Sequence, residues 1–112
     1  MTRLGLIQPF REALASDWQA SLQRDEWFFS RLEEEISTRL TPSEAFVAID
    51  EVAMLIQQQG EPLLQWRCGC FLLTLARRSD TTEVPPGLRS AWESVERQLR
   101  DNPEIAGELR SW

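Results

Sequence analysis

Two cysteines separated by one glycine, Cys68-Gly69-Cys70, have the residue types and close spacing of a metal or redox site. A tetrahedral zinc site, however, needs two further cysteine or histidine ligands, and the chain has no other cysteine and no histidine. On a helix, a turn of about 100° per residue places Cys68 and Cys70 on opposite sides, too far apart to share a metal or form a disulfide. We therefore expect no metal site and no cofactor.

The same motif is typical of close helix packing. Cys68 falls on an apolar helix face, and Gly69 forms a thin strip where another helix can approach closely. Cys70 projects toward Arg67, whose charge would lower the pKa of the thiol and make it reactive. No histidine is present to assist a catalytic cysteine. Packing is the expected role, and the reactivity of Cys70 stays open at this point.

Carboxylates are the other groups here with the potential for acid–base chemistry. Glu33, Glu34 and Glu35 are consecutive, and Glu26 precedes them in the same acidic part of the chain. Consecutive glutamates splay around a helix, so we expect a solvated face that binds basic groups rather than a catalytic pair. The chain also lacks lysine and tyrosine, and it contains no HExxH, GxSxG or glycine-rich phosphate loop. These observations predict a protein that is not an enzyme.

The charge distribution favours a basic protein partner. The formal net charge is −6, which argues against nucleic-acid binding because that function needs a basic stripe. Residues 12–61 hold eleven acidic residues and three arginines, whereas residues 65–112 hold seven of each. An acidic first half would steer a basic partner toward one side of the protein, although acidity also serves solubility alone.

The elements that position these residues are all predicted to be helices. A first helix begins near Pro9, with Phe10, Leu14, Trp18 and Leu22 at steps of four on one face. A second helix, capped by Asp25, runs to about Leu40 with Phe28, Leu32 and Ile36 facing inward. A capping box, Thr41-Pro42-Ser43-Glu44, starts a third helix that ends at Gln59-Gly60.

The second half continues this pattern. An apolar helix from Pro62 to about Arg78 is expected at the centre, antiparallel to the third helix. After the break SDTTEVPPGL come a fifth helix and a short last turn or helix capped by Asn102-Pro103. The prediction is a single all-α domain over residues 1–112. It has five to six helices, arranged as an antiparallel bundle or as HEAT-like helix pairs around the central apolar helix at about 62–78.

Some large apolar residues point away from these inner faces. Trp27 projects toward Arg31 and Glu34, as an interface anchor within a polar rim would, or else it packs under the first helix or the N-terminal arm. On the third helix, Val47, Met54 and Leu55 lie off the main apolar stripe. The predicted partner-binding residues are Glu26, Trp27, Glu33, Glu34, Glu44, Val47, Glu51 and Met54.

The segments WFFSRLEEEISTRLTPSEAF and LLTLARRSDTTEVPPGLRSAW resemble small, acidic, all-helical bacterial immunity proteins of polymorphic or contact-delivered toxin systems. The resemblance covers about Asp25 to Trp92 and rests on helix order, the TPSEA start and the SDTTEVPP loop. It implies a cytoplasmic inhibitor that neutralises one cognate toxin by occluding the toxin's active site. It carries no residue over position by position.

The alternative is a secretion chaperone or adaptor, often a homodimer, that holds an effector protein in an apolar groove. No apolar run approaches the ~20 residues needed to cross a bilayer, and the start MTRLGLIQPFRE lacks the features of a signal peptide. We expect a cytoplasmic monomer or homodimer that binds neither membrane nor nucleic acid.

Overall fold

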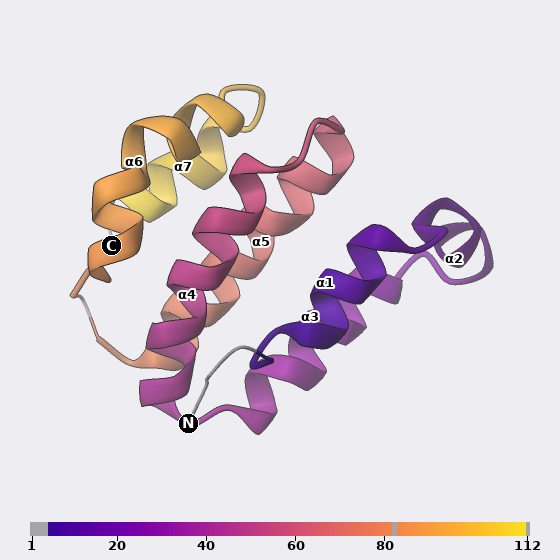
Figure 1. The fold of residues 1–112 in the computed structure, drawn as a ribbon, viewed down its shortest axis with the longest axis horizontal. Coiled ribbons are helices and arrows are strands. Elements are labelled where there is room, and N and C mark those ends of the chain that lie inside the picture. Colours follow the sequence, from indigo (N-terminus) through magenta and orange to yellow (C-terminus); the bar gives the residue numbers. More distant parts are fainter. Residues whose placement is uncertain (1–4, 82, 112) are drawn as a thin grey trace.

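The computed structural model describes residues 5–81 and 83–111, and within these ranges the regular structure consists of seven α-helices and no strands (Figure 1). The helices are α1 (Gln8–Ala15), α2 (Trp18–Arg24), α3 (Phe28–Arg39), α4 (Pro42–Gln57), α5 (Pro62–Ser79), α6 (Pro86–Gln98) and α7 (Pro103–Ser111). None of these helices is long and apolar enough to span a bilayer. The all-helical prediction is confirmed, with more helices than the five to six expected.

The additional helix arises because the predicted first helix is two helices, α1 and α2. The chain leaves the helical conformation at Ser16, whose hydroxyl donates a hydrogen bond to the carbonyl of Ala13 (2.7 Å). Asp17 then starts α2, since its carboxylate accepts a hydrogen bond from the backbone N–H of Ala20 (3.3 Å). These local bonds satisfy helix-end groups and override an apolar spacing that continues across the break.

The expected cap of the second helix by Asp25 is wrong, because α3 begins at Phe28 with Trp27 at its N-cap and no capping side chain. The starts of the four later helices follow the sequence signals closely. α4, α5, α6 and α7 each begin with a proline, where the missing N–H costs no intrahelical hydrogen bond. The capping box of α4 is confirmed: Thr41 Oγ1 accepts from Glu44 N–H (3.1 Å), and Glu44 Oε1 accepts from Thr41 N–H (2.9 Å). The carboxylate of Glu44 is thus already engaged in holding its own helix.

The antiparallel pair α4 and α5 occupies the middle of the molecule (Figure 1). α6 packs on α4 and α7 packs on α5, while α3 packs on the other side of α5 and carries α1 and α2. The end of α3 is tied to α5 by Arg78, whose Nε donates to the carbonyl of Leu40 (2.9 Å). α5 is therefore the central helix, as the sequence predicts.

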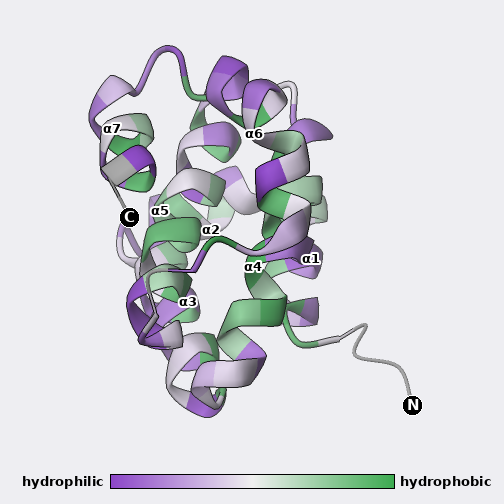
Figure 2. Cartoon of the chain, turned by 90° about the vertical axis from the view of Figure 1, so that its left-hand side faces the viewer, coloured by the Kyte–Doolittle hydropathy of each residue, from purple (hydrophilic) through white to green (hydrophobic). Residues whose placement is uncertain are grey.

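The buried apolar residues form one cluster that reaches most of the helices. Hydrophobic residues predominate along α4 in Figure 2. The residues whose spacing predicts an inner face on this helix are buried: Ala45, Ile49, Val52, Ala53 and Ile56. α1 joins this cluster through Phe10, whose ring centroid lies 4.5 Å from that of Phe71 and 6.2 Å from that of Phe29.

The inner face of α3 is rotated by one residue relative to the prediction. Phe29, Glu33 and Ile36 are buried, whereas Phe28 and Leu32, expected inside, are only partly buried. The face predicted from apolar spacing contains no charged residue, whereas the observed face contains a glutamate. A glutamate is accommodated there because a cation from another helix meets it.

The start of α6 is held by a side chain from α4. Pro85, at the N-cap position, offers no capping side chain, and Asp50 Oδ1 accepts from the backbone N–H of Leu88 (2.9 Å). A Cβ atom on Gly87 would lie 2.5 Å from Asp50 Cγ. Glycine at this position is what lets the carboxylate reach the end of the helix.

Candidate functional site

A buried ion pair between α3 and α5 is the most unusual polar feature of the described chain. Arg67 donates to Glu33 Oε2 from Nη2 (2.7 Å) and from Nε (3.1 Å), and the Glu33 residue is 3% exposed. The carbon of the guanidinium lies 4.8 Å from the centroid of the Trp66 ring and 5.8 Å from that of Phe29. Arginine suits this position because its flat, weakly hydrated head group stacks on aromatic rings while its N–H groups bind a carboxylate.

Burial governs the ionisation of this pair. It raises the pKa of Glu33 from 4.5 to about 7, although the charge and hydrogen bonds of Arg67 act in the opposite direction. Near neutral pH, the Glu33 carboxyl is therefore partly protonated. The prediction that Glu33 lies on a solvated helix face was wrong, and its direct contact with a partner across an open surface is excluded by its burial.

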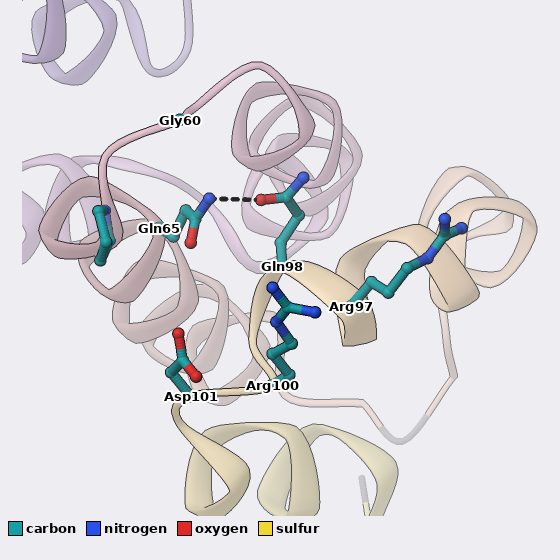
Figure 3. Close-up of a pocket in the computed structure, with 7 residues that line it drawn as sticks. Gly60, Gln65, Arg97, Gln98, Arg100 and Asp101 are labelled. Carbon is teal, nitrogen blue, oxygen red and sulfur yellow. Dashed lines mark hydrogen bonds between the residues drawn. The ribbon is translucent and has the colours of Figure 1, made fainter.

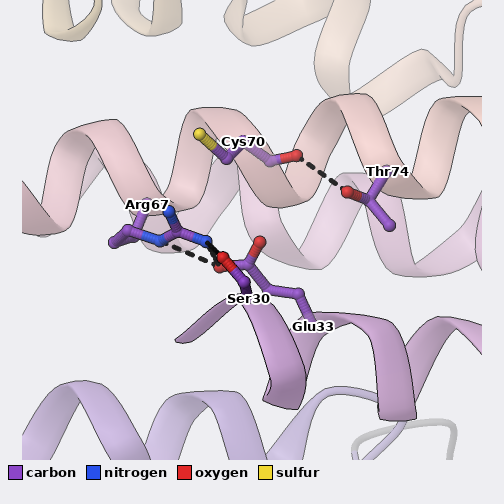
Figure 4. Close-up of polar contacts among 5 residues, drawn as sticks. All are labelled: Ser30, Glu33, Arg67, Cys70 and Thr74. Carbon is purple, nitrogen blue, oxygen red and sulfur yellow. Dashed lines mark hydrogen bonds and ion pairs between the residues drawn. The ribbon is translucent and has the colours of Figure 1, made fainter. Parts of the chain in front are cut away.

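The ion pair forms part of the wall of a hollow of about 420 Å³ between α3 and α5. Figure 4 shows Glu33 and Ser30 on α3 facing Arg67 on α5, with Cys70 and Thr74 farther along the same helix. The hydroxyl of Ser30 accepts from Arg67 Nη2 (3.4 Å), and Arg77 pairs with Glu108 (3.2 Å). The residues lining the hollow are Ser30, Glu33, Glu34, Arg67, Cys70, Leu73, Thr74 and Arg77.

The two cysteines behave as the packing interpretation expects, with one correction. Cys68 is fully buried, and burial raises the pKa of its thiol to about 12. Burial also raises the pKa of Cys70, and this effect exceeds the opposing charge of Arg67, so the expected lowering was wrong. Both thiols are free, and the described residues contain no group of three or more His, Cys, Asp or Glu side chains able to hold a metal.

Gly69 confirms the close approach expected between helices. A Cβ atom at this position would lie 2.8 Å from Leu99 Cδ2 and 3.1 Å from Ile105 Cγ2. Leu99 follows the last residue of α6 and Ile105 lies in the first turn of α7, so the glycine lets the connection between α6 and α7 rest directly on the backbone of α5.

The predicted partner-binding residues other than Glu33 lie at or near the surface. Trp27 is 62% exposed and Met54 is 63% exposed, so the alternative in which Trp27 packs under α1 is excluded. Leu55, expected to point outward, is buried. The exposed members are Glu26, Trp27, Glu34 and Met54, and the partly buried ones are Glu44, Val47 and Glu51.

The structure divides these residues between two places. The main contacts of α3 are with α5 and α1, whereas those of α4 are with α5 and α6. Glu26, Trp27 and Glu34 belong to the α3 side, and Met54 belongs to α4. Binding of a partner by both groups together stays a prediction.

A second hollow, of about 330 Å³, lies where the start of α5 meets the end of α6. Its wall includes Arg100 and Asp101, and Figure 3 shows Gln65 reaching across to Gln98, with their side-chain amides 2.6 Å apart. The Gln65 amide also donates to the carbonyl of Gln59 (2.8 Å), which closes the connection between α4 and α5. These bonds stabilise the connection between helices and leave the arginines at the surface.

Sequence reasoning missed the Glu33–Arg67 pair because its members lie 34 residues apart. One signal was available: Arg67 stands inside the apolar stretch of α5, and a charged residue on a buried helix needs an opposite charge nearby. Comparisons with models of protein families, with curated proteins and with solved structures give no match to this chain.

Proposed function

We propose that this protein is a non-catalytic inhibitor of the immunity-protein type, which binds a basic protein toxin and covers the toxin's active site. The observation that carries the proposal is the exposure of Trp27 in an acidic part of the chain. A tryptophan with an exposed apolar body and a charged surround is typical of residues that contribute most to binding energy at an interface.

The backbone under Trp27 is held in place, which makes it a preorganised anchor. Asp25 Oδ1 accepts from the backbone N–H of Trp27 (3.1 Å), and Arg31 Nη2 pairs with the same carboxylate (3.1 Å to Oδ2). The backbone carbonyl of Trp27 in turn accepts from Arg31 N–H (2.8 Å). A residue that is fixed before binding loses less conformational freedom when a partner covers it.

The charge of the chain supports a basic partner. Glu26 and Glu34 are exposed near Trp27 in the sequence, and the net charge is −6. Complementary charge raises the association rate and suppresses wrong partners. The carboxylates would thus engage Lys or Arg side chains that the toxin otherwise uses on its substrate.

The test is retention of a partner by the immobilised protein from the native cell lysate, followed by expression of the retained protein alone. The proposal expects a protein that is lethal alone and harmless when co-expressed with the wild-type chain. Trp27→Ala should weaken this complex by about 30-fold or more, the effect of losing about 2 kcal/mol. Gln57→Ala, at an exposed position on α4, serves as the control and should leave affinity unchanged.

Two results would reject parts of the proposal. If no retained protein is toxic, the protein is not an inhibitor of this type. If both Trp27→Ala and a Glu26→Gln/Glu34→Gln double variant bind as tightly as the wild type, the interface lies elsewhere.

A secretion chaperone remains the second candidate because of one apolar hollow. It measures about 260 Å³, and its wall includes Val84, Leu88, Trp92 and Leu109. Loss of effector binding in Trp92→Ala, with binding by Trp27→Ala unchanged, would favour this function over inhibition.

A further inference from the structure

We propose that the hollow between α6 and α7 binds a small carboxylic acid with an apolar body, and that Arg89 holds the carboxylate of this ligand. The hollow measures about 260 Å³ and is the one that has Trp92 in its wall. The inference goes beyond the proposed function and does not depend on it. The hollow is walled by α6, α7 and the segment before α6, whereas Trp27 lies at the N-cap of α3.

The wall contains the same pair of residues twice, a leucine followed by an arginine. Leu88 and Arg89 lie in the first turn of α6, and Leu109 and Arg110 lie in the last turn of α7. Both leucines are buried and both arginines are exposed, because adjacent residues on a helix point about 100° apart. The hollow therefore has apolar side chains at its floor and guanidinium groups at its rim.

Val84 and Trp92 complete the apolar part of the wall. Both are partly buried and pack against the hydrophobic core, and Trp92 lies one helical turn after Leu88 on the same face of α6. The volume of about 260 Å³ lies just below the ~300–1,000 Å³ of sites for drug-sized ligands. The hollow therefore suits a ligand with one aromatic ring and a short chain, whose ring can pack against the indole of Trp92.

The charge of the wall favours an anion. Arg89 and Arg110 are its charged residues, and no carboxylate of the described chain lines it. Arg110 pairs with Glu96 of α6. Among the described residues no carboxylate pairs with Arg89, not even that of Glu93 one turn farther along the same helix. One uncompensated positive charge at the mouth of an apolar hollow favours a ligand with one negative charge.

A carboxylate fits this rim better than other anions do. Its two oxygens lie in one plane and accept two parallel N–H groups from a single guanidinium. A phosphate group carries about two negative charges at neutral pH, and only one arginine of the wall lacks a partner. Arg110 gives one of its N–H groups to Glu96 and keeps others with which it can assist Arg89.

The α6 side of the hollow is fixed before a ligand binds. Pro85 and Pro86 restrict the backbone that enters α6, and Asp50 of α4 accepts a hydrogen bond from the backbone N–H of Leu88 (2.9 Å). A wall that is already in place loses little conformational freedom when a ligand enters. A small ligand can therefore bind without first ordering the site.

The experiment uses the free full-length protein and 4-phenylbutyrate as the probe. Binding is followed by NMR through the indole N–H of Trp92 and the methyl groups of Val84 and Leu109, which should shift saturably at millimolar or lower concentration. The amide 4-phenylbutyramide has the same shape without the charge and should bind about tenfold more weakly or worse, because it loses the charged hydrogen bonds to Arg89. Acetate at equal concentration has the charge without the ring and should cause no such shifts.

Three variants separate the roles of charge and shape, and the spectrum of each one also reports whether it folds. Arg89→Gln should reduce binding of 4-phenylbutyrate to the level of the amide and leave binding of the amide unchanged. Arg97→Gln removes another exposed arginine of α6, outside this hollow, and should bind as the wild type does. Val84→Phe places a larger side chain in the hollow and should abolish binding of both probes.

Equal affinity for the acid and the amide would show an apolar hollow without charge selection and would overturn the inference, as would the absence of saturable shifts. Wild-type affinity in Arg89→Gln would also overturn it. The peptide acetyl-Gly-Gly-Phe offers a similar ring and carboxylate on a longer chain. Binding of this peptide about tenfold tighter than 4-phenylbutyrate would assign the hollow to a protein segment, as the chaperone alternative expects, and overturn the assignment to a small acid. None of these outcomes alters the Trp27 test.

Discussion

Replacing Gly87 by alanine tests how α4 fixes the start of α6. The new Cβ would lie 2.5 Å from Asp50 Cγ, 2.7 Å from Oδ1 and 2.9 Å from Oδ2. Carbon atoms cannot approach that closely, so the Asp50 side chain must turn away. It then loses the hydrogen bond from Leu88 N–H (2.9 Å) and its favourable position at the positive end of a helix.

Two opposing effects determine how much Gly87→Ala changes the free energy of unfolding. Loss of a cap costs about 1–2 kcal/mol, whereas alanine is favoured over glycine in a helix by up to about 1 kcal/mol. Gly87→Ala should therefore destabilise the wild-type protein by about 1 kcal/mol. In an Asp50→Ala background the cap is already absent and the clash is gone, so the same change should stabilise by about 0.5–1 kcal/mol.

The assay is a double-mutant cycle of unfolding in denaturant, supported by melting temperatures. A change of about 1 kcal/mol corresponds to a shift of roughly 4–8 °C for a domain of this size. Gly107→Ala is the matched control, because a Cβ on this α7 glycine meets nothing within 4 Å, and it should stabilise in both backgrounds. The reasoning is refuted if Gly87→Ala has the same effect with and without Asp50.

Other perturbations probe the centre of the molecule. Gly69→Ala should lower the free energy of unfolding by about 1–3 kcal/mol, because the new methyl group overpacks against Leu99. If denaturant unfolding shows no change, α6 and α7 do not rest on α5. Burial raises the folded-state pKa of Glu33 from 4.5 to about 7, so the contribution of this group to stability is complete below pH 4.5 and is lost as pH rises through 7. Over this range the free energy of unfolding of the wild type should fall by up to about 3 kcal/mol relative to that of Glu33→Gln. Parallel pH profiles of the two proteins would contradict the pKa shift. In a thiol-labelling time course of the native protein, Cys70 should react slowly and Cys68 only on unfolding, and fast labelling of Cys68 would show that α5 is more open than described.

Much of the helical framework was predictable because its signals are local. The capping box at Thr41 and Glu44 and the prolines that open four helices act within one turn, so the sequence contains the whole interaction. The break at Ser16 was missed for a related reason. Apolar spacing continues through this break and predicts one long helix. Asp17 predicts the start of a new helix only if helix-end hydrogen bonds are given more weight than apolar periodicity.

The candidate site was less predictable because its energetics depend on distant partners. Apolar spacing predicted Phe28 inside and the run of glutamates predicted a solvated Glu33, whereas Phe29 and Glu33 are buried and Glu33 binds Arg67 of α5. The sequence left Trp27 open between an exposed and a packed position, and its exposure at the N-cap of α3 became clear only from the structure. Position on a helix face can be inferred from spacing, whereas the ionisation and pairing of a buried charge depend on tertiary structure.

The central position of the α4–α5 pair also has a kinetic consequence. The two helices are joined by four residues, Gln58 to Glu61, so their contacts form with little loss of chain entropy. The N-terminal helices and the α6–α7 segment each dock on this hairpin. The hairpin should therefore form early during folding, and its amides should be the slowest to exchange with solvent, while either flank can open without unfolding the other.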